Sequence, residues 1–238
     1  MISTYIVYNE LELDRKELVK QLQEKLPHSQ IIKSVYPREQ RVPFFSKIQK
    51  ISKDRTGKSL TEGEIGCLLS HRKVWRTILQ NNNSKEQSHL IVESDAVLVD
   101  PIQLAESFQF IEKQYDLFFW GAFEGRVKLF RSTRIKLNQQ FTIGIPLDKS
   151  LYCAYAYSIN KQAAAYLLKA TSRFGYPVDI WKIHLQDCTL KVGAVKPEII
   201  KIASNVATNI QNPARKFIIN WSLYLLVELK NRIIVLFK

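Results

Sequence analysis

The chain has 238 residues, enough for one ordinary globular domain or a domain with a short tail. Hydrophobic residues make up 46% of it and only 8 Gly and 8 Pro are present, which excludes a disordered chain. The formal net charge of +13 favours an anionic partner, such as a nucleotide, a phosphorylated glycolipid or an acidic membrane surface. Nucleic acid is not expected, because the sequence has neither a known reader motif nor basic residues interleaved with aromatic ones.

The three cysteines, Cys67, Cys153 and Cys188, are widely spaced and form no C-x-x-C pair. This pattern predicts neither a disulfide framework nor a zinc site, and it favours a reducing compartment. The first residues form a short β-like run without the basic and long apolar regions of a signal peptide. We therefore expect a cytoplasmic protein.

The chain opens with the pattern of a βαβ unit. Residues 4–8 are β-branched and aromatic and predict a strand. Asp14 is the predicted cap of a helix that runs to about Leu26, and residues 31–32 begin a second strand. This opening indicates an α/β fold that binds a nucleotide at the carboxyl ends of its strands.

Residues 33–58 are predicted to be loop and carry eight Lys or Arg against Glu39 and Asp54. Thr61 and Glu64 then have the spacing of a capping box, which opens a helix that should end near residues 81–84. Further along, we predict strands over 89–92, 117–120 and 154–159 and helices over 103–113 and 160–170, whereas 126–149 has no clear pattern.

Glu93 and Asp95 follow the apolar strand 89–92 directly. In an extended chain, residues two apart point the same way, so both carboxylates should face one spot. Oxygen ligands at that place suit Mn²⁺ or Mg²⁺, whose other ligands would be diphosphate oxygens and water. The alternative is that these two acids form an ordinary solvated turn.

Several segments, taken in order, resemble glycosyltransferase family 25, which includes the lipooligosaccharide galactosyltransferases and their procollagen-modifying relatives. The resemblance covers roughly residues 3–205. Its matching segments are Leu13-Asp14-Arg15, Leu60 to Cys67, Ser70-His71, Trp75, Leu90 to Ala96, Asp116-Leu117, Gly121, Ala156 to Ile159, Ala163-Ala164 and Pro177-Val178-Asp179.

The resemblance implies a GT-A-like α/β fold with a mixed central sheet and flanking helices, a UDP-sugar donor and dependence on Mn²⁺ (or Mg²⁺). It also implies that Glu93 and Asp95 bind the metal and the diphosphate. The sequence departs from the family at Ser94, which replaces the middle acid of an acidic cluster. It departs again at Val35-Tyr36-Pro37, where relatives have a small acidic-glycine turn.

The resemblance further implies donor contacts from Arg15, Glu64, Ser70 and His71. For three of these residues a structural alternative stays open. Arg15 is also explained as an exposed arginine at a helix start, Glu64 as the acid of the capping box, and His71 as a helix residue packed in the core.

Asp179 is the candidate catalytic base, since an inverting transfer needs a carboxylate to take the proton of the acceptor hydroxyl. It follows Pro177 in a predicted loop, where a side chain can face a cleft. Asp187 and Glu124 are rival candidates. A plain helix N-cap before Ile180 is the structural alternative for Asp179.

Residues 212–238 differ in composition from the preceding 1–211, the predicted catalytic domain. Aromatic and aliphatic residues fall on one helical stripe flanked by Lys and Arg, over an apolar run too short to span a bilayer. This predicts an amphipathic helix at an anionic membrane surface. The alternative is a terminal helix packed on the domain or on a second subunit, as in a homodimer.

Together these features predict an inverting, metal-dependent transferase that moves a hexose, by resemblance galactose, from a UDP-sugar to a lipooligosaccharide or lipopolysaccharide acceptor. The predicted location is the cytoplasmic face of a bacterial inner membrane. UDP-glucose or UDP-N-acetylhexosamine as donor, or an inactive relative that only binds a partner, are the alternatives.

Overall fold

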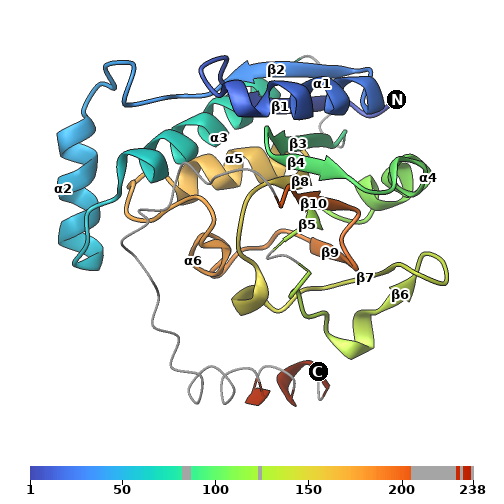
Figure 1. Cartoon of the computed structure of the whole chain (residues 1–238). Coiled ribbons are helices and arrows are strands. Elements are labelled where there is room, and N and C mark those ends of the chain that lie inside the picture. The colour runs from blue at the N-terminus through green and yellow to red at the C-terminus, as the bar shows by residue number, and fades with distance from the viewer. Residues whose placement is uncertain (82–86, 123–124, 205–228, 231–232, 237–238) are drawn as a thin grey trace.

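The computed structural model describes residues 1–81, 87–122, 125–204, 229–230 and 233–236. This part of the chain forms a mixed eight-stranded sheet in the order β2-β1-β3-β8-β5-β9-β7-β6, with a two-stranded sheet of β4 and β10 beside it (Figure 1). The strands are β1 (Thr4–Tyr8), β2 (Ser29–Lys33), β3 (His89–Glu93), β4 (Ala96–Leu98), β5 (Leu117–Gly121), β6 (Ile135–Lys136), β7 (Thr142–Gly144), β8 (Ala156–Ile159), β9 (Val192–Lys196) and β10 (Ile200–Ile202).

Helices cover both faces of the large sheet. The α-helices are α1 (Lys16–Lys25), α2 (Phe45–Thr56), α3 (Glu62–Gln80), α4 (Pro101–Glu112), α5 (Lys161–Ala170) and α6 (Trp181–His184), and the short 3₁₀ turns are η1 (Leu13–Arg15), η2 (Arg131–Thr133) and η3 (Asp148–Ser150). One core cluster joins α3 and α5 to one sheet face, and a second joins α1 and α4 to the opposite face. This is the predicted α/β architecture with a mixed central sheet and flanking helices.

The first three strands of the sheet run parallel. β1 lies between β2 and β3, and Val7 of β1 is in register with Glu93 of β3. The carboxyl ends of the three strands therefore meet at one edge of the sheet, which is where ligands bind in α/β folds. The segments after them, which begin at Asn9, Ser34 and Ser94, converge there.

Most predicted elements are present, but two expectations were wrong. Residues 45–56, predicted as loop, form α2; this helix has no side-chain cap at Phe44 and ends at Gly57, which adopts φ +75°. A capping side chain is the main sequence signal for the start of a helix, so its absence at Phe44 explains why the helix was not predicted. Asp14 does not cap α1, since a 3₁₀ turn precedes this helix and its N-cap, Arg15, makes no side-chain cap bond.

The unassigned segment 126–149 supplies the edge strand β6 and its neighbour β7. These strands are only two and three residues long, which explains why the sequence shows no clear alternation there. Most of the predicted tail, 212–238, lies outside the described residues, as does the boundary at 211. None of the helices in the described ranges combines the length and the apolar character that a bilayer span requires.

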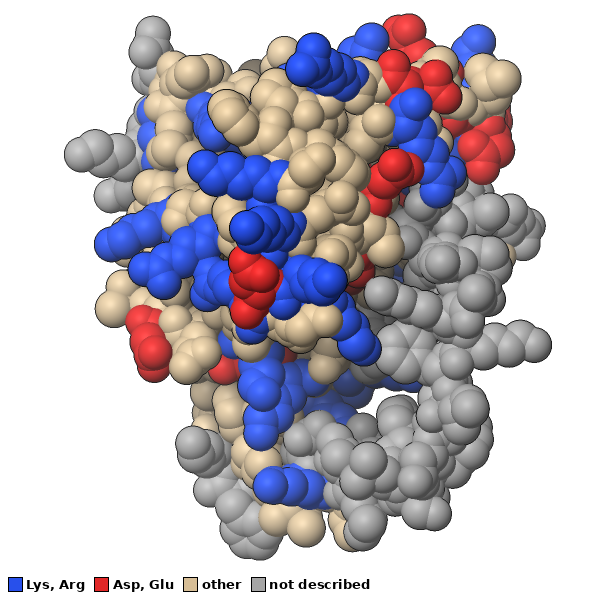
Figure 2. Space-filling view, turned by 90° about the vertical axis from the view of Figure 1, so that its left-hand side faces the viewer, with Lys and Arg blue, Asp and Glu red and all other residues tan. Residues whose placement is uncertain are grey.

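Basic side chains gather around α2. Figure 2 looks onto the side of the molecule that carries α2, where Lys and Arg outnumber acidic side chains. The exposed basic residues of α2 and its flanking loops are Arg38, Arg41, Lys47, Lys50, Lys53, Arg55 and Lys58. They form what we call the basic face.

His89 should make the protein sensitive to mild acid. The side chain is fully buried in β3, and burial, helped by the charge of Lys161, lowers its pKa to about 4 from 6.5. The folded state binds the His89 proton less tightly than the unfolded chain does. The contribution of neutral His89 to the free energy of unfolding is therefore complete above pH 6.5 and decreases as the pH falls towards 4. The expected loss is at most about 3 kcal/mol.

Urea unfolding at pH 7, 5.5 and 4.5 measures this loss. His89→Gln should reduce the pH dependence over that window, whereas His28→Gln, at an exposed position before β2, should leave it as in the wild type. Equal slopes for wild type and His89→Gln would show that His89 is not the titrating group.

Candidate functional site

A pocket lies at the edge where the three parallel strands end. Its lining comes from the segments after β1, β2 and β3 and from the first half of α3: Val7, Glu12, Arg15, Ser34, Val35, Tyr36, Pro37, Arg38, Glu62, Gly63, Gly66, Cys67, Ser70, His71, Glu93, Ser94 and Asp95. Among the predicted catalytic and donor-binding residues, Arg15, Ser70, His71, Glu93 and Asp95 are in this lining. Glu64 and Asp179 are not.

Arg15 is the centre of a buried ionic network. Its guanidinium lies 3.2 Å from Asp95 Oδ2 and 3.8 Å from Glu12 Oε1, and it donates a hydrogen bond to Ser94 Oγ at 3.0 Å. Ser94 in turn donates to Glu12 Oε2 at 3.1 Å. Arg15 is only 7% exposed, so it is not a solvated arginine at a helix start.

Asp95 is 6% exposed, so the acidic pair does not form a solvated turn. The chain turns at Ser94 and Asp95 instead of continuing the strand, so the extended geometry on which the prediction rested does not hold. Both carboxylates still line the same pocket, but with separate partners: Asp95 faces Arg15, and Glu93 faces α3. Burial and the charge of Glu93 raise the pKa of Asp95 to about 6, against the opposing effect of Arg15.

Glu93 ends a chain of hydrogen bonds that begins in the core. His71 Nε2 lies 2.9 Å from Glu93 Oε1, and His71 Nδ1 lies 2.8 Å from the Tyr157 hydroxyl, which accepts from Trp75 Nε1 at 2.8 Å. An ionised carboxylate only accepts, so we assign a ring proton to Nε2. Burial alone would raise the pKa of Glu93, but the hydrogen bond and charge of His71, with Arg15, lower it.

His71 is fully buried and yet lines the pocket through this contact. It is therefore a packed core residue that also holds Glu93 in place, and a direct donor contact from His71 stays a prediction.

Ser70 fixes the segment that follows β2. Its hydroxyl accepts from Val35 N at 2.8 Å and donates to Gly66 O at 2.7 Å. Gly66 makes the close approach possible, because a Cβ there would lie 2.7 Å from Val35 O and 2.8 Å from Pro37 Cδ. Residues 35–37, where the sequence departs from the family, therefore form one wall of the pocket.

Gly66→Ala should deform this wall. The added methyl would displace the segment 35–37, at a cost of about 1–3 kcal/mol of stability, and on the prediction of a nucleotide site it should weaken UDP binding at the pocket. Thermal unfolding and UDP titration measure the two effects. Gln80→Ala, at an exposed position of the same helix, is the control; a Gly66→Ala protein with wild-type stability and UDP affinity would contradict the expectation.

Glu64 has a structural role in this structure. Its carboxylate accepts from Thr61 N at 2.7 Å while Thr61 Oγ1 accepts from Glu64 N, which completes the predicted capping box of α3. A donor contact from Glu64 stays a prediction.

Asp179 lies before α6 but is not its N-cap, a position held by Ile180. The side chain is half-buried, and burial together with the negative charges of Glu93 and Glu64 raises its pKa. It therefore lies near the Glu93 side of the pocket. The rival Asp187 lines a different pocket, beside α5 and α6, and Glu124 lies outside the described residues.

Several site residues were not predicted. Glu12 could not be recognised from the sequence as a site residue, because its partners Arg15 and Ser94 come together only in the fold. The one available signal was its spacing of three residues from Arg15, which allows an ion pair. Tyr157 reaches His71 from β8, 86 residues away. Cys67 donates to Glu93 Oε1 at 3.6 Å from one helical turn before His71.

The residues present fit a divalent cation at Asp95 and Glu93. Asp95 Oδ1 is buried and has no hydrogen-bond partner among the described residues. A hard cation prefers such carboxylate oxygens. Arg15 offsets charge at the other oxygen, Oδ2, and leaves Oδ1 available as a ligand.

A mixed sheet with an acidic pocket at the carboxyl ends of its parallel strands is a Rossmann-like α/β fold with a ligand site at the usual place. The family model of glycosyltransferase family 25 (LPS biosynthesis protein) matches residues 1–181, and the chain belongs to this family. No curated protein matches the chain.

Proposed function

We propose that this glycosyltransferase is metal-dependent and transfers a hexose, most simply galactose, from a UDP-sugar to a lipooligosaccharide or lipopolysaccharide acceptor, with inversion. The family match over residues 1–181 supports the reaction class. The observation that carries the donor assignment is the acidic pair Glu93 and Asp95 on the wall of a pocket at the carboxyl ends of β1, β2 and β3.

Arg15, Glu93 and Asp95 would hold the donor diphosphate together with Mn²⁺ or Mg²⁺. When bound, such a cation neutralises charge on the departing UDP. Arg15 adds a fixed positive charge beside it, since the guanidinium is held rigidly by Glu12, Ser94 and Asp95. His71 and Tyr157 keep the Glu93 carboxylate in position from the core side.

Asp179 would act as the base. The acceptor oxygen bonds to the anomeric carbon from the face opposite UDP, the bond to the diphosphate oxygen breaks, and the hydroxyl proton passes to the Asp179 carboxylate. The raised pKa of Asp179, caused by burial and the charge of Glu93, makes it a better proton acceptor than an exposed aspartate.

The basic face offers a surface for an anionic acceptor or membrane (Figure 2). One of its members, Arg38, also lines the pocket, so the face reaches the donor site. A phosphorylated glycolipid at the cytoplasmic side of a bacterial inner membrane fits this charge. Attachment through the tail 212–238, and a homodimer, stay proposals.

A donor screen tests the function. The full chain is incubated with Mn²⁺, a lipooligosaccharide acceptor and UDP-galactose, UDP-glucose or UDP-N-acetylhexosamine, and acceptor-dependent UDP release is measured. One donor should be turned over by the wild type and not by Asp95→Asn. Turnover of another UDP-sugar would replace galactose as the proposed transferred sugar. Binding of a donor without release of UDP would favour the alternative of an inactive relative.

A further inference from the structure

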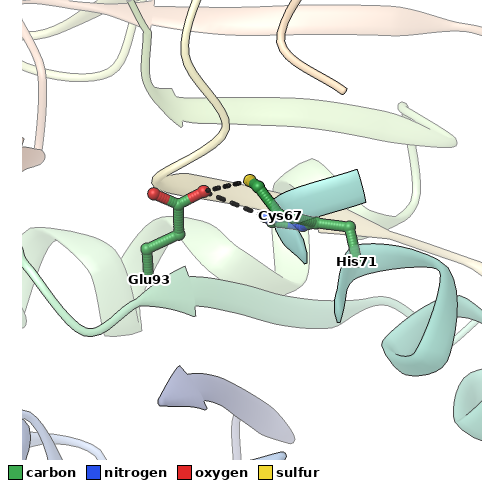
Figure 3. A group of neighbouring side chains, drawn as sticks. All are labelled: Cys67, His71 and Glu93. Atoms are coloured by element: carbon green, nitrogen blue, oxygen red, sulfur yellow. Dashed lines mark hydrogen bonds and ion pairs between the residues drawn. The ribbon is translucent and has the colours of Figure 1, made fainter. Parts of the chain in front are cut away.

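Cys67, His71 and Glu93 bring three metal-ligand atoms together. Cys67 and His71 are four residues apart on α3 and therefore lie on the same helix face. Figure 3 shows both side chains directed towards the carboxylate of Glu93 at the end of β3. One ligand atom from each of the three residues, namely a thiol sulfur, an imidazole nitrogen and a carboxylate oxygen, lies within 4.8 Å of the other two.

The sulfur-to-oxygen separation matches a tetrahedral zinc ion, and the nitrogen-to-oxygen separation is shorter than such an ion requires. Zinc lies about 2.3 Å from sulfur and about 2.1 Å from nitrogen or oxygen, which at tetrahedral angles puts S and O about 3.6 Å apart and N and O about 3.4 Å apart. The observed distances from Glu93 Oε1 are 3.6 Å to Cys67 Sγ and 2.9 Å to His71 Nε2. To bind the ion, the His71 imidazole and the Glu93 carboxylate need to move apart by only a few tenths of an ångström.

We propose that Cys67, His71 and Glu93 form a zinc site whose fourth coordination position opens into the pocket. All three residues line that pocket, so water or a ligand group can complete the tetrahedron. Thiolate and imidazole ligands select zinc over Mg²⁺ or Mn²⁺. The two sites share Glu93, whose Oε1 faces Cys67 and His71, whereas Asp95 belongs to the proposed donor-cation site alone.

The surroundings of His71 suit a metal ligand. With zinc on Nε2, the ring proton is on Nδ1 and is donated to the Tyr157 oxygen, 2.8 Å away, which fixes the imidazole plane. The Cys67 thiol loses its proton on binding, so one proton is released to solvent for each zinc ion bound. A search for C-x-x-C misses this site, because its ligands come from one helix face and the end of a distant strand.

Cobalt titration tests the site without donor or acceptor. The full chain, freed of metal by chelation, is titrated with Co²⁺, which takes tetrahedral sites and gives thiolate-to-cobalt charge-transfer absorption when cysteine is a ligand. We expect a band that saturates at one equivalent, disappears on addition of Zn²⁺, is absent in Cys67→Ser and persists in Cys188→Ser. Absence of the band in the wild type, or its persistence in Cys67→Ser, overturns the site.

Alkylation of the wild type provides a second measurement in case Cys67→Ser fails to fold. Zn²⁺ should protect Cys67, but not Cys188, from iodoacetamide, as read by peptide mass spectrometry. Equal labelling of Cys67 with and without Zn²⁺ refutes the proposal. Neither readout depends on UDP binding or sugar transfer, so failure of the zinc site is distinguishable from failure of the proposed function.

Discussion

Arg15→Met should destabilise the protein by about 3–5 kcal/mol and abolish binding of UDP. Removing one partner of a buried ion pair leaves the other charge uncompensated, and here two carboxylates, Asp95 and Glu12, lose the same guanidinium. The effect is large because Arg15 and Asp95 are both almost fully buried.

Urea unfolding of matched variants measures this coupling. The double variant Arg15→Met, Asp95→Asn should be more stable than Arg15→Met alone, because the second change removes the uncompensated negative charge of Asp95. Arg38→Met is the control: Arg38 pairs with Glu62 at 3.5 Å on the exposed surface, and its loss should cost less than about 1 kcal/mol. Similar losses for Arg15→Met and Arg38→Met would mean that the buried network does not stabilise the fold.

Asp179→Asn should lower kcat by about 10²–10⁴-fold while the KM for the donor changes little. The substitution removes the proposed proton acceptor but keeps the size of the side chain. Because burial and the charge of Glu93 raise the pKa of Asp179, the wild-type rate should fall on acidification at a pH above the usual carboxylate range. That acid limb should be missing from the residual activity of Asp179→Asn.

Asp187→Asn is the matched control for Asp179→Asn. Asp187 has a positive φ of 57°, a conformation that asparagine also tolerates, so the variant should fold normally. It lines a pocket away from Glu93 and should keep wild-type kcat. A large loss in Asp187→Asn, or none in Asp179→Asn, would reassign the base.

Local signals in the sequence predicted the fold well. The βαβ opening placed β1, α1 and β2, and the capping box at Thr61 and Glu64 placed the start of α3. Both patterns act over a few residues, so they can be read without knowledge of the fold. The helix α2 was missed because it starts without a capping side chain.

The candidate site was predicted only in part. Glu93 and Asp95 stood out because they follow an apolar strand directly. The guanidinium that neutralises Asp95, however, comes from Arg15, and the hydroxyl that orients His71 comes from Tyr157. These pairings join segments about eighty residues apart, and sheet order rather than sequence spacing brings them together.

Calorimetric titration of UDP with and without Mn²⁺ tests the central claim, that the pocket at the ends of β1, β2 and β3 holds a metal-bound nucleotide diphosphate. For the wild type, UDP should bind more tightly when Mn²⁺ is present. This gain should vanish in the double variant Glu93→Gln, Asp95→Asn, while Asp187→Asn should retain it. UDP binding of equal strength in the wild type and the double variant, with Mn²⁺ present, would contradict the claim.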